Sequence, residues 1–176
     1  MTEAYEAFEK SITDSEKLLA IFDDLKVSID IDSQETLKRS SLVMVAVAWE
    51  TYIEDLVTEL LSAKLEVISG SKIGRFVEGA LDQRIKALHN PNSQKVKQLF
   101  EEFFEVDITE GWEWNNFDVK RARTTLNSWL SLRGDAVHRA RAIDDNTSLV
   151  RRDELLKCIR FFKELVRVTD EKASKI

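Results

Sequence analysis

An arginine and a histidine lie five positions apart in the stretch WLSLRGDAVHRARA, which spans residues 129–142. An imidazole can take up or release a proton near neutral pH, and a guanidinium is a permanent cation that suits a phosphate. Metal-free cleavage of RNA needs both groups, because the proton of the 2′-hydroxyl must move while negative charge grows on the phosphoryl oxygens. Arg133 and His138 are therefore a sufficient minimal pair for such a reaction.

The spacing alone does not identify a site, because the sequence RIKALH repeats it with Arg84 and His89. His89 opens the turn sequence HNPN, where an imidazole can meet the last carbonyls of a helix, so this first pair has a structural explanation. The second pair encloses Gly134, and glycine inside a helix costs about 1 kcal/mol relative to alanine. A close approach at Gly134 by another backbone, a partner helix or a phosphate would compensate, and we expect one.

Helix geometry limits how the second pair can act. Residues five apart on a regular α-helix point about 140° away from each other, at ~100° per residue. Arg133 and His138 can therefore converge on one phosphate only if the helix is locally distorted or if a dimer pools their side chains. Asp135 lies three positions before His138, a spacing at which a carboxylate can interact with the imidazole.

Positive charge is concentrated around the second pair, although the whole chain has a net charge of −6. Residues 1–117 contain 12 Lys and Arg against 23 Asp and Glu, whereas residues 118–167 contain 12 against 7. This segment is either a solvated, salt-bridged helical surface or a face that binds a polyanion such as RNA. The candidate RNA-binding residues are Lys120, Arg121, Arg123, Arg139 and Arg141.

The composition predicts an all-α protein, because five glycines and one proline leave little to separate strands. Its 176 residues suit a single domain over 1–176, with an N-terminal helix within 1–30 and a frayed tail over 169–176. Helical periodicity and cap residues predict six helices, beginning after Thr2, at Ser33, at Ser71, at Ser93, near Asn116 or Asp118, and after Asn146 or Ser148. The fifth of these would run to about residue 142.

Several residues are expected to belong to the core. The segment 42–49, LVMVAVAW, is apolar on every side of a helix, which predicts burial between several neighbours. Cys158 has no cysteine to pair with and is expected to be a buried core residue. Trp112 and Trp114 occupy the clear loop DITEGWEWNNF, and we expect them to hold this loop against the core.

The sequence does not support a metal site, a catalytic triad or a glycine-rich phosphate loop. Two histidines 49 positions apart and one distant cysteine match neither a metal-ligand spacing nor a catalytic triad. The glycines are scattered singly, so a glycine-rich phosphate loop is not expected. No apolar run approaches the ~20 residues that a membrane span requires. We therefore expect no metal, no cofactor, no membrane partner and a cytoplasmic location.

The stretch LNSWLSLRGDAVHRA resembles the signature segment of the HEPN superfamily, in which an Arg, four to six residues and a His lie on a helix near the end of the domain. The form RG-acid-small-aliphatic-HR is most similar to the RiboL-PSP-HEPN group. An earlier segment, VAVAWETYIEDLVTELL, is similar to a helix of that group, with Trp49 beside Glu50 and a second acid at Glu54. Glu50 and Glu54 are thereby candidate supporting acids.

This resemblance implies an up-and-down helical bundle that forms a homodimer and places two Arg–His segments beside a shared cleft. Active members of the superfamily are metal-independent endoribonucleases, often toxins or defence effectors, and a toxin implies an antitoxin partner. Carried over to this chain, Arg133 contacts the scissile phosphate, His138 acts on the 2′-hydroxyl or the leaving group, and Asp135 orients the histidine. The implied products carry a 2′,3′-cyclic phosphate and a 5′-hydroxyl.

Two other functions remain open at this point. The same fold could serve as a non-catalytic module whose basic segment holds RNA or a partner protein, or the chain could be a purely structural helical protein. Many active members have Asn or another polar residue directly after the arginine, where this chain has Gly134. Cleavage, more than the fold, is therefore the property that needs a test.

Overall fold

The computed structural model describes residues 1–138 and 148–176, apart from the side chain of His138. The chain forms, in order, α1 (Glu3–Leu25), α2 (Ile31–Leu65), the short 3-10 helix η1 (Glu66–Ile68), α3 (Lys72–Lys86), α4 (Ser93–Phe104), the 3-10 helix η2 (Ile108–Gly111), α5 (Val119–His138) and α6 (Arg152–Ala173). The described part of the chain contains no β-strand. The predicted all-α fold with six α-helices is confirmed.

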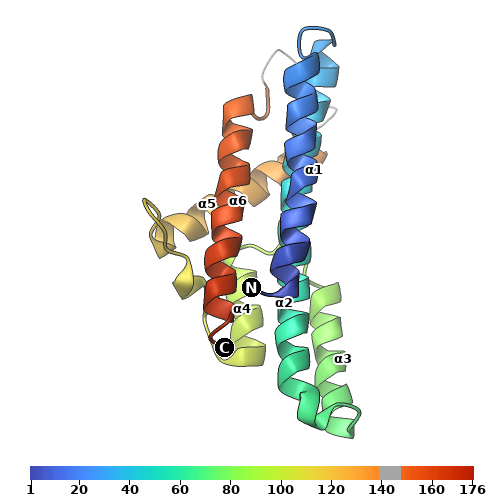
Figure 1. Ribbon diagram of the computed structural model, residues 1–176, viewed down its shortest axis with the longest axis vertical. Coiled ribbons are helices and arrows are strands. Elements are labelled where there is room, and N and C mark those ends of the chain that lie inside the picture. Colours follow the sequence, from blue (N-terminus) through green and yellow to red (C-terminus); the bar gives the residue numbers. More distant parts are fainter. Residues whose placement is uncertain (139–147) are drawn as a thin grey trace.

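Three long helices, α1, α2 and α6, run up and down side by side, and α5 crosses behind them (Figure 1). The second helix is the longest, with 35 residues, because its sequence contains no Gly or Pro to end it. Its second half extends past the other long helices and packs against α3 (Figure 1). None of the helices in the described ranges is long and apolar enough to cross a membrane.

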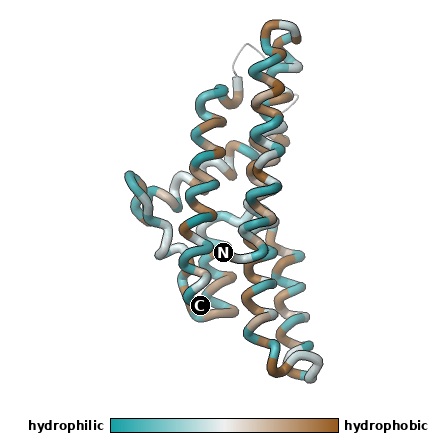
Figure 2. Tube along the Cα trace, in the orientation of Figure 1, coloured by the Kyte–Doolittle hydropathy of each residue, from teal (hydrophilic) through white to brown (hydrophobic). Residues whose placement is uncertain are grey.

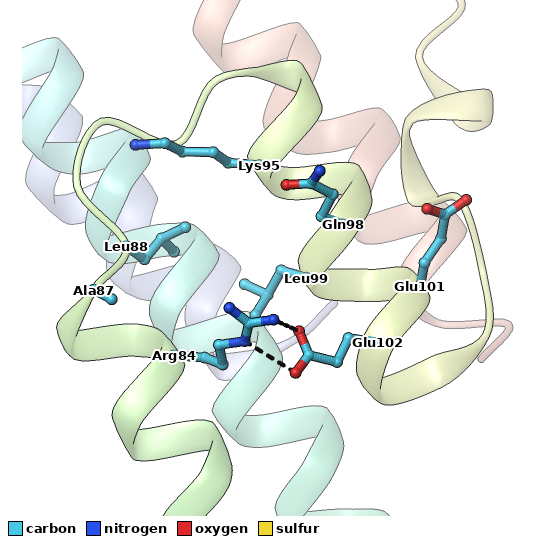
Figure 3. A pocket seen from close by; sticks show the side chains of 8 residues that line it. All are labelled: Arg84, Ala87, Leu88, Lys95, Gln98, Leu99, Glu101 and Glu102. Carbon is cyan, nitrogen blue, oxygen red and sulfur yellow. Dashed lines mark hydrogen bonds and ion pairs between the residues drawn. The ribbon is translucent and has the colours of Figure 1, made fainter.

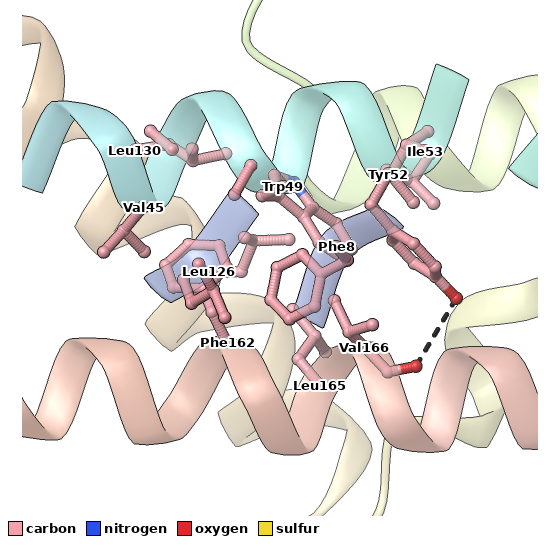
Figure 4. Close-up of a cluster of buried hydrophobic side chains, with 14 of the residues drawn as sticks. Phe8, Val45, Trp49, Tyr52, Ile53, Leu126, Leu130, Phe162, Leu165 and Val166 are labelled. Carbon is pink, nitrogen blue, oxygen red and sulfur yellow. Dashed lines mark hydrogen bonds between the residues drawn. The ribbon is translucent and has the colours of Figure 1, made fainter. Parts of the chain in front are cut away.

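The core gathers around the middle of α2, which includes the apolar segment 42–49. Figure 4 shows Trp49 of α2 among Phe8 of α1, Leu126 of α5 and Phe162 of α6. Trp49 is fully buried, and its ring centroid lies 5.9 Å from that of Phe162. Three residues of the segment are not fully buried: Val43 and Met44 are partly buried, and 40% of Val47 remains exposed.

Both tryptophans of the loop pack against the core, as predicted. Trp112 is fully buried, and its Nε1 donates a hydrogen bond of 2.9 Å to Thr169 Oγ1 on α6. Trp114 stacks on Phe117 with ring centroids 4.7 Å apart, and both rings lie against Phe161. Cys158 is also buried, as expected, and burial raises the pKa of its thiol well above the usual range.

Two predicted helix starts are wrong. Asp30, and not Ser33, caps α2, because its carboxylate accepts a hydrogen bond of 2.9 Å from the Ser33 backbone N–H. The sixth helix begins at Arg152, after Ser148, whose hydroxyl instead bonds to Lys38 and Glu35 of α2. The other cap candidate, Asn146, lies outside the described residues.

The prediction of a frayed tail over 169–176 is also wrong for most of this range. Helix α6 continues to Ala173, and Thr169, Asp170 and Ala173 are buried. The Asp170 carboxylate accepts a hydrogen bond of 2.5 Å from the Thr2 hydroxyl, so the first turn of α1 holds the last turns of α6. The charged tail sequence predicts fraying, but contacts with residues far away in the sequence hold most of the tail in α6.

Candidate active site on α5

Helix α5 presents one side to the core and carries Arg133 on that side. Ala122, Leu126 and Leu130 are buried and lie four positions apart, which places them on one face of the helix. Arg133 follows three positions after Leu130 and therefore continues the same face. The side chain of Arg133 is half-buried, and its Nε atom is enclosed without a hydrogen-bond partner among the described residues.

An enclosed and unpaired guanidinium N–H is energetically unfavourable. A buried donor left without a partner costs about 1–3 kcal/mol, and a charged group costs more. Such groups are rare in folded proteins, so each one calls for an explanation. Within the described ranges, Arg133 Nε is the single buried side-chain nitrogen or oxygen that has no hydrogen-bond partner. This unpaired donor distinguishes Arg133 from the other buried polar side chains of the described helices.

Arg123, a predicted RNA-binding residue, is instead engaged within the protein. Its Nε donates a hydrogen bond of 2.9 Å to Thr109 Oγ1, and its Nη2 lies 3.1 Å from Asp107 and 2.7 Å from Glu110. These contacts hold η2 and the loop before it against α5. A structural function of Arg123 therefore explains its position without RNA.

The other predicted RNA-binding residues do not converge on Arg133. Lys120 and Arg121 are exposed in the first turn of α5, and Arg121 lies 4.7 Å from the Phe117 ring centroid. Thirteen residues separate Lys120 from Arg133, which corresponds to about 20 Å along the helix axis. Arg139 and Arg141 lie outside the described residues.

Helix α5 is continuous through the second Arg–His pair. Gly134 does not adopt a positive φ, and no described heavy atom lies within 4 Å of the position that a Cβ would occupy there. The predicted close approach is therefore wrong for the described residues of the same chain, while an approach by a second molecule or a phosphate stays a prediction. The helix is likewise regular at Gly134, so positions 133 and 138 lie about 140° apart around its axis, at ~100° per residue.

Asp135 is half-buried on the same helical turn as Arg133. Its predicted role toward the imidazole of His138 stays a prediction, since the histidine side chain is not described.

The two candidate supporting acids lie on α2, and one of them, Glu50, contacts the turn between α3 and α4. Glu50 Oε1 accepts a hydrogen bond of 2.9 Å from the backbone N–H of Asn90, whose φ is 56°. Trp49 Nε1 donates a hydrogen bond of 2.9 Å to the carbonyl of Pro91. The Trp49–Glu50 pair therefore anchors the turn HNPN to α2. The sequence marks both segments as distinctive, but it does not reveal that they contact each other.

Glu54 lies one turn further along α2, and burial raises the pKa of its carboxyl, with Glu50 and Asp55 adding to the effect and His89 opposing it. The folded state therefore binds this proton more tightly than the unfolded state does. Stability is expected to fall as pH rises from the ordinary glutamate value of 4.5 through the raised pKa. Glu54→Gln should consequently raise the melting temperature at neutral pH, because the amide removes an unfavourable charge.

Thermal unfolding of both proteins at neutral pH and below the ordinary glutamate pKa checks this prediction. Glu113→Gln, at an exposed loop position, is the matched control. A Glu54→Gln variant whose melting temperature equals that of the wild type at neutral pH would contradict it.

Arg84 of the first Arg–His pair lines a groove between α3 and α4 that measures about 640 Å³. Figure 3 shows Arg84 paired with Glu102 across this groove, with Nε 2.9 Å from Oε1 and Nη2 2.6 Å from Oε2. Lys95 Nζ donates to the carbonyl of His89. Arg84 therefore has a carboxylate partner where Arg133 has none among the described residues, which supports a structural role for the first pair.

The described residues hold no group of three or more His, Cys, Asp or Glu side chains that could bind a metal ion. Comparison with known protein families shows that the family model described as RiboL-PSP-HEPN matches residues 10–175. No curated protein and no solved structure matches the chain significantly. The matched residues include both the Trp49–Glu50 helix and α5, and they leave out only a few residues at each end. The chain therefore belongs to the RiboL-PSP-HEPN family of the HEPN superfamily.

Proposed function

We propose that the protein is a metal-independent endoribonuclease that uses α5 to cleave RNA. The observation that carries the proposal is Arg133, whose enclosed Nε lacks a hydrogen-bond partner among the described residues. A guanidinium pairs well with a phosphate in both charge and geometry, and the half-buried side chain leaves part of Arg133 accessible to a phosphate. Membership of the HEPN superfamily supports the same reading of α5.

The reaction moves one proton from the 2′-hydroxyl and supplies one proton to the leaving oxygen. The 2′-oxygen attacks phosphorus, the bond from phosphorus to the 5′-oxygen breaks, and a 2′,3′-cyclic phosphate and a 5′-hydroxyl result. Arg133 binds the non-bridging oxygens, whose charge increases in the transition state. His138 takes the first proton or supplies the second, and Asp135 orients its imidazole.

We infer that the site is completed in a homodimer. Arg133 and His138 diverge on a regular helix, so a second molecule is needed to bring an arginine and a histidine to one phosphate. Two exposed apolar side chains on α5 and α2 support such a contact: 47% of Val137 and 40% of Val47 are accessible. The open space at Gly134 leaves room for the partner helix.

Mixing two inactive variants tests the pooled site. Equal amounts of Arg133→Ala and His138→Ala are expected to recover about a quarter of wild-type activity, since half of the dimers are mixed and each has one intact site of two. Cleavage rates of the separate and mixed variants, after exchange of subunits, give the measurement. Complete inactivity of a mixture that demonstrably contains mixed dimers would place both groups of a site on one chain.

Incubation with RNA in EDTA distinguishes the enzyme from a binding module of the same fold. The proposal predicts cleavage, whereas a binding module predicts retention of intact RNA, with affinity that falls steeply as salt increases. Single-stranded and structured RNA should both be tried, with DNA of the same sequence as a control that lacks the 2′-hydroxyl. Intact RNA in all conditions would end the enzymatic proposal.

We also propose that the protein acts in the cytoplasm as a toxin or defence effector that an antitoxin partner restrains. Expression of the wild type should then arrest growth of the host, and expression of Arg133→Ala should not. Equal growth at equal protein levels would contradict this role.

A further inference from the structure

Most of the exposed large apolar side chains among the described residues gather at the two ends of the molecule. Helix α2 is about 52 Å long at 1.5 Å per residue, and its two ends lie at opposite ends of the molecule (Figure 1). We call the exposed apolar residues at the α1–α2 turn the head patch: Ile21, Leu25, Val27 and Ile31. We call those around η1 and the start of α3 the tail patch: Val67, Ile68, Ile73 and Phe76.

Both patches are strongly exposed. In the head patch, 92% of Val27 and 68% of Ile31 are accessible, and in the tail patch the values are 95% for Val67 and 75% for Phe76. Figure 2 shows apolar segments at both ends of the elongated chain trace. Exposed apolar side chains that gather in this way are a sign of an interaction surface, whereas single ones are ordinary.

The two patches carry opposite charge. Between its outermost apolar residues the head patch contains three aspartates and one lysine; Asp23 pairs with Arg152 of α6, whereas Asp24 and Asp30 are exposed. Between Val67 and Phe76 the tail patch contains Lys72 and Arg75, both exposed, and no acid. Contact between two heads would place aspartates together, and contact between two tails would place cations together, whereas a head and a tail are complementary.

We propose that the head patch of one molecule binds the tail patch of a second copy of this chain. The contact is heterologous, because it joins two different surfaces, and it therefore continues from molecule to molecule unless its geometry closes a ring. It is separate from the α5 contact, since Val47 and Val137 lie outside both patches. The head-to-tail contact does not depend on whether α5 cleaves RNA.

Two substitutions at exposed positions can block one end each. Val27→Lys places a cation in the head patch opposite Lys72 and Arg75, and Phe76→Glu places an acid in the tail patch opposite the head aspartates. Neither side chain is packed in the core, so both variants should fold, and far-ultraviolet circular dichroism checks this. Thr58→Lys, exposed on α2 between the two patches, is the control for a change of charge.

Sedimentation velocity over a concentration series measures the association. The wild type and Thr58→Lys should form species whose mean size grows with concentration, and each end variant should associate at least about tenfold more weakly. Mixing Val27→Lys with Phe76→Glu should restore association, because an intact head then meets an intact tail. If α5 also forms a dimer, the mixture grows beyond two molecules, and if it does not, the mixture stops at pairs.

Either size of the restored species supports the head-to-tail contact, so failure of the α5 dimer is distinguishable from failure of this proposal. A wild type whose size is independent of concentration would overturn it. An end variant that associates as the wild type does, or a mixture that does not recover, would also overturn it, because the contact would then use another surface or join like ends.

Discussion

Arg133→Ala is expected to slow RNA cleavage by at least about 10²–10³-fold, the loss typical of removing one donor that stabilises charge in a transition state. The effect should appear in kcat as well as in binding, because the guanidinium is most needed when charge on the phosphoryl oxygens is greatest. Stability should not fall in parallel, since the substitution removes an enclosed N–H that has no partner among the described residues. Single-turnover cleavage and thermal unfolding of the same preparations measure the two effects.

The chain supplies its own spacing-matched control. Arg84→Ala and His89→Ala alter the first Arg–His pair and should leave the cleavage rate close to that of the wild type, because Arg84 is held by Glu102. His138→Ala should resemble Arg133→Ala in rate. Equal activity of Arg133→Ala and the wild type would remove α5 from the chemistry, and an equal loss in Arg84→Ala would show that the distinction between the two pairs is wrong.

Trp49→Ala is expected to lower the free energy of unfolding by about 3–5 kcal/mol, the usual cost of truncating a large buried aromatic residue. Trp49 is fully buried, and its ring lies 6.0 Å from Tyr52 and 6.1 Å from Trp112, so the substitution opens a cavity where α2 meets its neighbours. It also removes the hydrogen bond to Pro91 that fixes the α3–α4 turn. Urea unfolding followed by circular dichroism gives the measurement.

Trp49→Phe separates the two contributions. Phenylalanine keeps most of the apolar volume but cannot donate to the Pro91 carbonyl, so the expected loss is about 1–3 kcal/mol. Glu50→Gln keeps an acceptor near Asn90 and should cost less than either change at Trp49. A Trp49→Ala protein as stable as the wild type would contradict the core that the structure shows.

The helices of this fold can be predicted from the sequence, because helical periodicity and capping depend on residues close together in the chain. The apolar segment 42–49 predicted a buried length of α2, and Trp49 at its end is fully buried. Thr2 was predicted to cap the first helix, and its side chain accepts from the backbone N–H of Tyr5. Such features depend on residues within a few positions of each other, which is why the sequence alone reveals them.

Features that depend on partners from other elements cannot be predicted from local sequence. Arg123 looked like part of a basic surface, but Asp107 and Glu110 from the preceding loop neutralise it. The charged end of the chain looked frayed, but Asp170 is held by Thr2, 168 positions earlier. A charged residue is exposed to solvent only when no partner from another element pairs with it. Whether such a partner is near depends on the tertiary fold.

For the second Arg–His pair, one part of the site can be predicted from local sequence and another part depends on the tertiary fold. Its family signature can be recognised from residues 126–140, and the family match over residues 10–175 confirms the recognition. The enclosed Nε of Arg133 could not be foreseen, because it results from how α5 crosses the bundle. Gly134 is predicted to be a point of close approach by another backbone, a partner helix or a phosphate, and the described residues of the same chain leave open space beside it.

The ends of RNA fragments produced in EDTA test the central claim most directly. Wild-type protein is predicted to leave a 2′,3′-cyclic phosphate and a 5′-hydroxyl, and a substrate with a 2′-deoxynucleotide at the cleaved position should remain intact, because the 2′-oxygen is the nucleophile. Arg133→Ala should produce neither fragment at a comparable rate. Intact RNA with the wild type, or fragments with 3′-hydroxyl and 5′-phosphate ends, would contradict the assignment of α5 as the site of metal-free cleavage.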